Sequence, residues 1–166
     1  MSWYAFYTRS RAEKSATALL REQGIEAYLP LQSLVHQWSD RKKTVEVPLI
    51  RGYVFARPTP EQYYKVLNTK GIVCCVYHCG KPAVIPEEDI LTLKAVVASR
   101  LETESRPQTF VPGQKVRFTG GPLEGRTGIL TRISGKNKVA LRIEPLDLAL
   151  LVTVSPGLLE ILSQSE

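Results

Sequence analysis

The spacing of apolar residues predicts strands and helices that alternate along the first 100 residues. Residues 3–7 are aromatic apart from Ala5, which is typical of a strand covered on both faces. An apolar stripe at helical spacing follows, and Gly24 ends it. Further strands are predicted at 25–29, 52–56 and 72–77, and further helices begin at Thr59 and Pro86. This order indicates an α+β sandwich with a mainly antiparallel sheet.

Two helix starts have the spacing of a capping box, in which a Ser or Thr caps the residue three positions on and that residue's side chain reaches back. Ser10 and Glu13 have this spacing before the first helix. Thr59 and Gln62 have it before the second, with Pro60 at a position that suits the first helical turn. The third helix begins with acidic residues, where the helix dipole favours them. Its predicted apolar stripe is Ile90, Leu93, Val97 and Leu101.

Residues 31–47 predict a hairpin with two strand arms around a polar tip at 39–43. Residues 102–109 are polar, with little to bury, and are predicted to be a linker. We therefore expect domains at residues 1–101 and 110–166. The second is predicted to be all-β, because apolar and polar residues alternate in it and Ser134-Gly135-Lys136-Asn137 suits a hairpin turn. Its length fits a small five-stranded, SH3-like barrel.

Charge and aromatic residues are concentrated in the first part of the chain. The net charge is +6, of which residues 1–100 contribute +5 and residues 101–166 only +1. Eleven of the 13 aromatic residues also lie in residues 1–100. Excess positive charge favours a polyanion such as nucleic acid, or an acidic protein surface. A surface that needs aromatic anchors is therefore expected in the first part.

Several functional classes find no support in the sequence. No apolar run approaches the roughly 20 residues that span a bilayer, and the first residues lack the pattern of a secretory signal, so we expect a cytoplasmic protein that makes no membrane contact. No phosphate-binding loop or metalloprotease or hydrolase motif is present, so we expect neither an enzyme nor a cofactor.

Three cysteines, Cys74, Cys75 and Cys79, lie within six residues and make a poor disulfide framework. Zinc requires four converging ligands, whereas adjacent strand residues such as Cys74 and Cys75 point to opposite faces. Buried, apolar cysteines on the sheet are the preferred interpretation.

The segment 111–128 contains Val111-Pro112-Gly113-Gln114-Lys115-Val116 followed by Gly121-Pro122-Leu123-Glu124-Gly125 and Gly128. Glycines here suit positive φ angles or close backbone contact between two strands. A purely structural strand–turn–strand is one interpretation. Over roughly residues 111–133 the chain also resembles the KOW motif of transcription elongation factors and some ribosomal proteins. The matching motif residues are Gly113, Val116, Gly121, Pro122, Gly125 and Gly128.

A second segment, Pro48-Leu49-Ile50-Arg51-Gly52-Tyr53-Val54-Phe55, reads alone as an aromatic strand. Together with the aromatic start and the KOW-like segment it resembles the NusG family, in which an N-terminal NGN domain is linked to a C-terminal KOW domain. The resemblance spans nearly the whole chain, and the order of elements matches. That family usually has Phe-Pro-Gly-Tyr where this chain has Ile50-Arg51-Gly52-Tyr53, so an aromatic residue and a rigid turn are replaced and a charge is added.

This resemblance implies that the first domain grips the clamp helices of the largest subunit of RNA polymerase, bridges to the opposite pincer and suppresses pausing. Trp3, Ala5 and Tyr7 share one face of their strand, and Tyr4 and Phe6 share the other. One face suffices for the sheet's own helices, so surplus rings could form an exposed anchor patch; the alternative is that both faces are covered. The expected polymerase-binding residues are Trp3, Tyr4, Tyr7, Pro48, Arg51, Gly52, Tyr53 and Phe55.

Basic residues gather near the first helix and at the hairpin tip. A solvated charged face is the simple interpretation, and contact with the non-template DNA strand of the transcription bubble is the alternative. The family position supports DNA contact for Arg9 and Arg11, whereas the hairpin tip varies among such factors. The expected nucleic-acid-binding residues are Arg9, Arg11, Lys14, Arg41, Lys42 and Lys43.

The runs at 25–30 and 38–49 are similar to the UpxY group of specialised NusG paralogues, which promote transcription through polysaccharide operons by antitermination. The resemblance implies a small-subunit ribosomal protein or the Rho terminator as partner of the KOW domain. In the paralogue RfaH this domain switches fold, and residues 146–152 here are compatible with a helix or a strand. A general elongation factor and a ribosome-associated RNA-binding protein are the alternatives, although the near-neutral charge of the second part argues against the latter.

Overall fold

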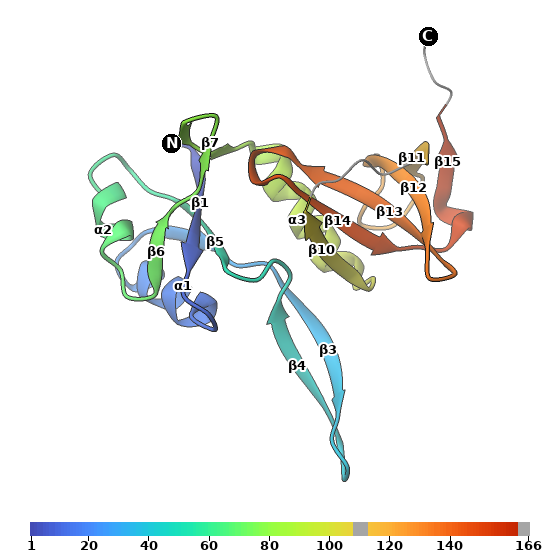
Figure 1. Ribbon diagram of the computed structural model, residues 1–166, viewed down its shortest axis with the longest axis horizontal. Helices are drawn as coiled ribbons and strands as arrows, with labels where there is room; N and C mark the ends of the chain where they lie inside the picture. The colour runs from blue at the N-terminus through green and yellow to red at the C-terminus, as the bar shows by residue number, and fades with distance from the viewer. Residues whose placement is uncertain (108–112, 163–166) are drawn as a thin grey trace. The chain divides into compact units, whose positions relative to one another are not determined.

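The computed structural model describes residues 1–107 and 113–162, which form two compact units, residues 1–90 and 91–166 (Figure 1). In the described residues, none of the helices has both the length and the apolar character that a membrane span requires.

The first unit is built on an antiparallel sheet, as the sequence predicts. Its path runs β2-β5-β1-β6, and β9 also pairs with β1. The bounds are β1 Trp3–Thr8, β2 Glu26–Tyr28, β5 Tyr53–Arg57, β6 Ile72–Cys75 and β9 Val84–Ile85.

One face of this sheet packs against two helices, α1 (Glu13–Glu22) and α2 (Tyr63–Leu67). Strand register places Phe6 opposite Val54, and both are fully buried. Leu20 of α1 and Val66 of α2 are fully buried in the same cluster. Because alternate residues of β1 and β5 share a face, this cluster is the core of the first unit.

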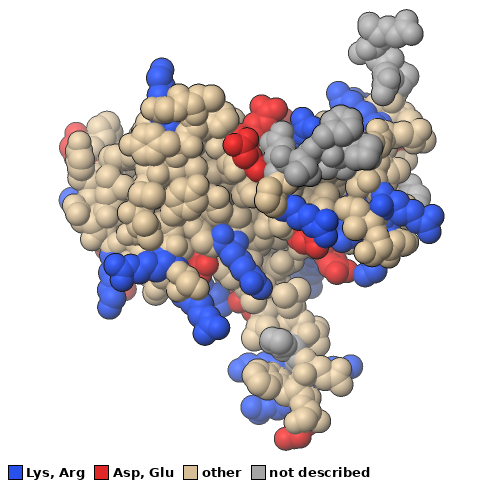
Figure 2. Space-filling model, viewed as in Figure 1, with Lys and Arg blue, Asp and Glu red and all other residues tan. Residues whose placement is uncertain are grey.

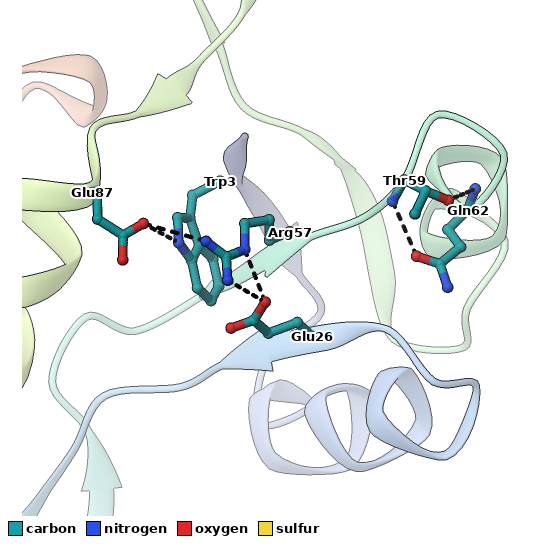
Figure 3. A network of polar contacts seen from close by, with 6 residues as sticks. All are labelled: Trp3, Glu26, Arg57, Thr59, Gln62 and Glu87. Atoms are coloured by element: carbon teal, nitrogen blue, oxygen red, sulfur yellow. Dashed lines mark hydrogen bonds and ion pairs between the residues drawn. The ribbon is translucent and has the colours of Figure 1, made fainter. Parts of the chain in front are cut away.

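The predicted caps are partly wrong. The side chain of Ser10 does not cap α1, whose first turn follows Ala12 without a side-chain cap. Glu13 is instead bonded to a backbone amide 39 residues further on. The second box does form: Gln62 Oε1 accepts a hydrogen bond from the Thr59 N–H at 3.0 Å, and the Gln62 N–H donates to Thr59 Oγ1 at 3.3 Å (Figure 3). Helix α2 itself begins one residue later, at Tyr63.

The end of α1 agrees with the sequence. Gly24 has a φ of +75°, and the amides of Gly24 and Ile25 donate to the carbonyls of Arg21 and Leu20. These two bonds satisfy carbonyls that a helix end leaves without a partner.

Helix α3 spans Glu87–Ser99, close to its predicted bounds. Ile90, Leu93 and Val96 are its buried apolar residues. Val97 is only partly buried and Leu101 is exposed, so the predicted stripe is wrong in its second half. Leu101 lies outside the helix because Arg100 adopts a left-handed conformation with φ +56°, which ends α3 before it.

The predicted hairpin is present as β3 (Leu31–Gln37) and β4 (Lys42–Pro48), a two-stranded sheet that extends away from the main sheet of the first unit (Figure 1). Its Val35 and Trp38 side chains are largely exposed. A second, shorter hairpin joins β7 (Tyr77–His78) to β8 (Lys81–Pro82).

The second unit contains a six-stranded antiparallel sheet rather than five strands, in the order β10-β14-β13-β12-β11-β15. The Ser134-Gly135 turn joins β12 to β13 as predicted, and residues 148–153 are extended. The bounds are β10 Thr103–Pro107, β11 Gln114–Phe118, β12 Thr127–Ile133, β13 Lys136–Ile143, β14 Leu148–Thr153 and β15 Leu159–Ile161, with 3-10 turns at Glu144–Leu146 and Pro156–Leu158.

The additional strand, β10, comes from the segment that was predicted to be a linker. It pairs with β14 over five residues. Its Glu104 lies 3.6 Å from Lys138 Nζ, and the preceding Glu102 lies 3.4 Å from Lys136 Nζ. Backbone pairing and side-chain ion pairs therefore join this strand to the sheet. A hydrophobicity pattern reveals neither kind of contact. Residues 108 and 109 of the predicted linker, Phe110, and the first two residues of the KOW-like segment, Val111 and Pro112, lie outside the described residues.

Candidate docking surface and basic cleft

The sheet face opposite the α1 and α2 side carries the rings that were expected to form an anchor patch. Register places Ala5 opposite Phe55 and Tyr7 opposite Tyr53. Phe55 is fully buried and Trp3 is 4% exposed, so neither ring is available to a partner. The prediction that these two residues bind polymerase directly is therefore wrong for this structure. Tyr7 is 38% exposed and Tyr53 is half-buried, so these two neighbouring rings remain accessible at their end of the face.

Tyr7 and Tyr53 form one aromatic surface, which we call the tyrosine pair. Their ring centroids lie 5.0 Å apart at an interplanar angle of 47°. Burial, followed by a hydrogen bond with Tyr7, raises the pKa of Tyr53 to about 12. Both rings are thus held in place by each other while one side faces solvent. Rings of this kind are favoured anchors in protein interfaces because they lose little conformational entropy on binding.

Tyr4 does not belong to the tyrosine pair, although it was predicted to share its role. It lies on the opposite sheet face, with its ring centroid 5.8 Å from that of Tyr63 on α2. The ring centroid of Tyr63 in turn lies 5.9 Å from that of Tyr64. This second aromatic group packs around the start of α2.

Trp3 is held inside the unit by a polar network that joins three strands to the start of α3 (Figure 3). Its Nε1 donates to Glu87 Oε2 at 2.9 Å, and the Arg57 guanidinium lies 5.1 Å from the centre of its ring. Arg57 also pairs with Glu26 at 2.6 Å and Glu87 at 3.5 Å. A buried indole requires a partner for its N–H and gains from a cation over its face. These contacts explain why Trp3 supports the sheet instead of projecting from it.

Gly52, directly before Tyr53, is fixed through both of its backbone polar groups. Its N–H donates to Glu13 Oε1 at 2.9 Å, and its carbonyl accepts from the Thr8 N–H at 2.9 Å. Its φ is +82°, a conformation that favours glycine. The Glu13 side chain is only 7% exposed. Sequence reasoning missed this role for Glu13 because the capping-box spacing offered a local partner for the same carboxylate.

An open cleft of about 760 Å³ lies between the start of α1 and the connection from β4 to β5. Lys14 Nζ crosses it to donate to the Glu46 carbonyl at 2.7 Å. The cleft therefore brings together residues that were predicted for two different partners, namely Arg11 and Lys14 for nucleic acid and Pro48, Arg51 and Gly52 for polymerase. It is lined by Thr8, Ser10, Arg11, Glu13, Lys14, Glu46, Val47, Pro48, Arg51 and Gly52.

The surroundings of the cleft are basic. Arg9, Arg11 and Arg51 are exposed, and Arg9 lies beside the cleft without lining it. Figure 2 shows Lys and Arg side chains gathered around the α1 end of the first unit and again along the β3–β4 hairpin. Arg41, Lys42 and Lys43 belong to the hairpin, where all three are exposed. The predicted basic residues thus form two groups, one at the cleft and one at the tip.

The KOW-like segment uses its glycines for two physical reasons. Gly121 and Gly125 have positive φ angles of +75° and +85° in the connection between β11 and β12. Gly113 and Gly128 instead lie against a neighbouring strand: a Cβ on Gly128 would come within 2.6 Å of the Ala140 carbonyl oxygen. Val116 is fully buried, and Pro122 is exposed. Both kinds of constraint that the sequence suggested are present.

The three cysteines do not share one environment. Cys75 is buried in the core of the first unit, whereas Cys74 and Cys79 are exposed. Burial raises the pKa of the Cys75 thiol. The expectation of buried cysteines is correct for Cys75 and wrong for the other two, since Cys74 points to the opposite face of β6 and Cys79 lies in the turn between β7 and β8.

Three comparisons with known proteins agree. A family described as "Transcription termination factor nusG" matches residues 1–94. The transcription termination/antitermination protein NusG of Campylobacter jejuni is 26% identical over 139 residues, which cover 77% of this chain and 78% of that protein. A solved structure of Thermotoga maritima NusG, 20% identical, superposes with a TM-score of 0.62 over 98% of this chain and 97% of that chain, and confirms the fold. The family match includes the whole unit that holds the tyrosine pair and the basic cleft.

Proposed function

Since the chain belongs to the NusG family of transcription termination and antitermination factors, we propose that it binds RNA polymerase through the tyrosine pair and helps the enzyme pass pause and termination sites. The observation that carries this proposal is that Tyr7 and Tyr53 remain accessible side by side at one end of a sheet face on which Trp3 and Phe55 are buried. The proposed target is the clamp helices of the largest polymerase subunit.

The local chemistry supports a protein partner at this surface. A rigid pair of tyrosines offers apolar area and hydroxyl groups together, which suits a helical partner with mixed side chains. Pro48, Arg51 and Gly52 border the same region through the cleft. Arg51 adds a positive charge for acidic residues of the partner.

Replacement of Tyr53 by alanine is expected to weaken binding to purified RNA polymerase about 30-fold, because truncation of an interface hot spot costs about 2 kcal/mol. Binding is measured by co-purification and by a fluorescence titration. Tyr53→Phe keeps the ring and should bind within a few-fold of the wild type. Tyr64→Ala, which removes an exposed ring on α2, is the matched control. Wild-type affinity of Tyr53→Ala with an intact fold would contradict the docking surface.

The basic cleft is proposed to contact the non-template DNA strand while the tyrosine pair is docked. Arg9 and Arg11 are both exposed at the start of α1, so both guanidinium groups are available to phosphates. The hairpin tip residues Arg41, Lys42 and Lys43 are proposed to add a second contact further along the nucleic acid.

The double variant Arg9→Ala, Arg11→Ala is expected to bind single-stranded DNA more weakly, with a smaller dependence on salt. Each lost phosphate contact should reduce the slope of log K against log salt concentration by about 0.7. Fluorescence anisotropy at several salt concentrations measures this slope. Arg132→Ala, Arg142→Ala removes the same charge from exposed positions of the second unit. Equal losses in the two double variants would mean that net charge alone, and not the cleft, governs binding.

The second unit is proposed to be a KOW domain that binds a protein, either a small-subunit ribosomal protein or Rho. A specialised role in polysaccharide operons, as in the UpxY group, is proposed from the runs at 25–30 and 38–49. The second candidate is a general elongation factor, which the similarity to the Campylobacter jejuni protein favours.

Run-off transcription with purified polymerase on templates that contain pause and terminator sites tests the proposed function. We expect faster passage of pauses and more read-through when the chain is added. Read-through that also requires a particular operon leader would support the specialised role, whereas an effect on all templates would support the general one. No change in pausing or termination on either kind of template would refute the proposal.

A further inference from the structure

Glu13 occupies an unusual place for a carboxylate. It is the first residue of α1, yet it is 7% exposed and its Oε1 accepts a hydrogen bond from the Gly52 N–H. Glutamate is rarely buried to this degree unless its charge is satisfied by partners. The carboxylate therefore stays inside the unit in order to hold another segment of the chain.

The segment that it holds is the turn directly before the tyrosine pair. Gly52 precedes Tyr53, and the Thr8 amide that binds the Gly52 carbonyl follows Tyr7. Nothing lies within 4 Å of the position that a Cβ on Gly52 would occupy. Leu49 and Ile50 anchor the start of this turn by burial, whereas Gly52 has no side chain to pack and is held by its two hydrogen bonds.

The next residue of α1 makes a parallel connection. Lys14 Nζ donates to the carbonyl of Glu46 in β4, at the other end of the connection that leads to β5. Two successive residues at the start of one helix thus bind the beginning and the end of the segment 46–52. Arg11 and Arg51 both line the cleft that these bonds cross.

We propose that Glu13 is a positioning residue that holds Gly52, and through it Tyr53, in the geometry in which the first unit docks on RNA polymerase. This inference rests on the proposed function of the tyrosine pair. The carboxylate does not touch the partner; it acts through the Gly52 amide. What matters is the reach of the side chain and its acceptor oxygen, and the negative charge itself is secondary.

Two conservative variants distinguish the effect of the length of the Glu13 side chain from the effect of its charge. Glu13→Gln keeps the length of the side chain and an acceptor oxygen but removes the charge. Glu13→Asp keeps the charge but is one methylene shorter and does not reach Gly52. Thr17→Ala is the control for general damage to α1, because Thr17 is buried in the same helix and its Oγ1 donates to the Glu13 carbonyl without contact to Gly52.

The first measurement is amide hydrogen exchange by NMR. In Glu13→Asp, we expect the Gly52 amide to exchange at least tenfold faster than in the wild type, while the Leu20 amide changes no more than it does in Thr17→Ala. In Glu13→Gln, both amides should exchange at nearly the wild-type rate. The second measurement is polymerase affinity, which should fall about tenfold in Glu13→Asp and stay within about twofold in Glu13→Gln and Thr17→Ala.

Wild-type protection of Gly52 in Glu13→Asp would overturn the inference, and so would faster exchange at Gly52 with unchanged polymerase affinity. Equal losses of affinity in Glu13→Asp and Glu13→Gln would also overturn it, because charge would then matter more than reach. Failure of the proposed function has a different signature: Tyr53→Ala would then bind polymerase like the wild type, whatever the exchange rate of Gly52.

Discussion

Replacement of Gly128 by alanine is expected to destabilise the second unit by about 3 kcal/mol, the upper end of the usual cost of overpacking. A Cβ at this position would lie 2.6 Å from both the Ala140 carbonyl oxygen and Val139 Cγ1, and 3.0 Å from Leu141 Cδ2. These atoms belong to β13, which pairs with the strand that contains Gly128. Backbone on a central strand of the sheet does not move aside cheaply, so the strand pairing itself must shift.

Thermal unfolding measures this effect, and the position of the aromatic residues simplifies the experiment. Both tryptophans and all seven tyrosines lie in residues 1–90, so their signals report on the first unit and serve as an internal reference. NMR signals of β13 amides report on the second. For a unit of this size, a loss of about 3 kcal/mol lowers Tm by more than about 10 °C.

Two other glycines provide matched controls for Gly128→Ala. Gly125 has open space around its Cβ position but a φ of +85°, so Gly125→Ala should cost about 1 kcal/mol through backbone strain. Gly157 has open space around its Cβ position and no positive φ angle, so Gly157→Ala should leave the stability nearly unchanged. If Gly128→Ala lowered the free energy of unfolding no more than Gly125→Ala does, β12 and β13 would not lie as close together at Gly128 as the structure shows.

The strands and helices could be predicted because their signals are local. Gly24 and the apolar spacing before it predict the end of α1 from adjacent residues alone, and the bonds that close the helix are local as well. The turn at Ser134 and Gly135 is predicted for the same reason. In each case the physical cause lies within a few residues of its effect.

The role of Glu13 could not be predicted, because the sequence offers it a local partner that the fold does not use. The spacing from Ser10 is that of a capping box, a common local motif. The structure assigns the carboxylate to Gly52, 39 residues away, since the fold brings the β5 end of the sheet against the start of α1. Strand β10 was missed for a related reason, because its polar residues are joined to the sheet by partners that come later in the chain.

The candidate site shows the same limit. Tyr53 and Phe55 are two residues apart on one strand, and period-2 alternation correctly places them on one face. Alternation cannot show which end of that face is covered, because burial depends on elements distant in sequence. Phe55 is sealed and Tyr53 is not, so the sequence identifies the face but not the docking residue.

This distinction leads to a second large effect, in Phe55→Ala. Phe55 is fully buried at the centre of the sheet, opposite Ala5 on β1 and Tyr28 on β2. Removal of a buried phenyl ring leaves a cavity and typically costs about 3–5 kcal/mol, which is a large part of the total stability of a small domain. We expect the first unit of Phe55→Ala to unfold at a much lower temperature than the wild type, and polymerase binding to fall with the folded fraction.

Thermal unfolding followed through Trp3 fluorescence measures this loss in a Trp38→Phe background, where Trp3 is the sole tryptophan. Phe55→Leu keeps most of the apolar volume and should cost less than about 1.5 kcal/mol while it retains polymerase binding. Tyr53→Ala, on the same strand and face, should show the reverse pattern, with a fold close to the wild type and weak binding. A Phe55→Ala chain that unfolds like the wild type but does not bind polymerase would mean that Phe55 contacts polymerase directly. Only a direct contact could then explain the lost affinity.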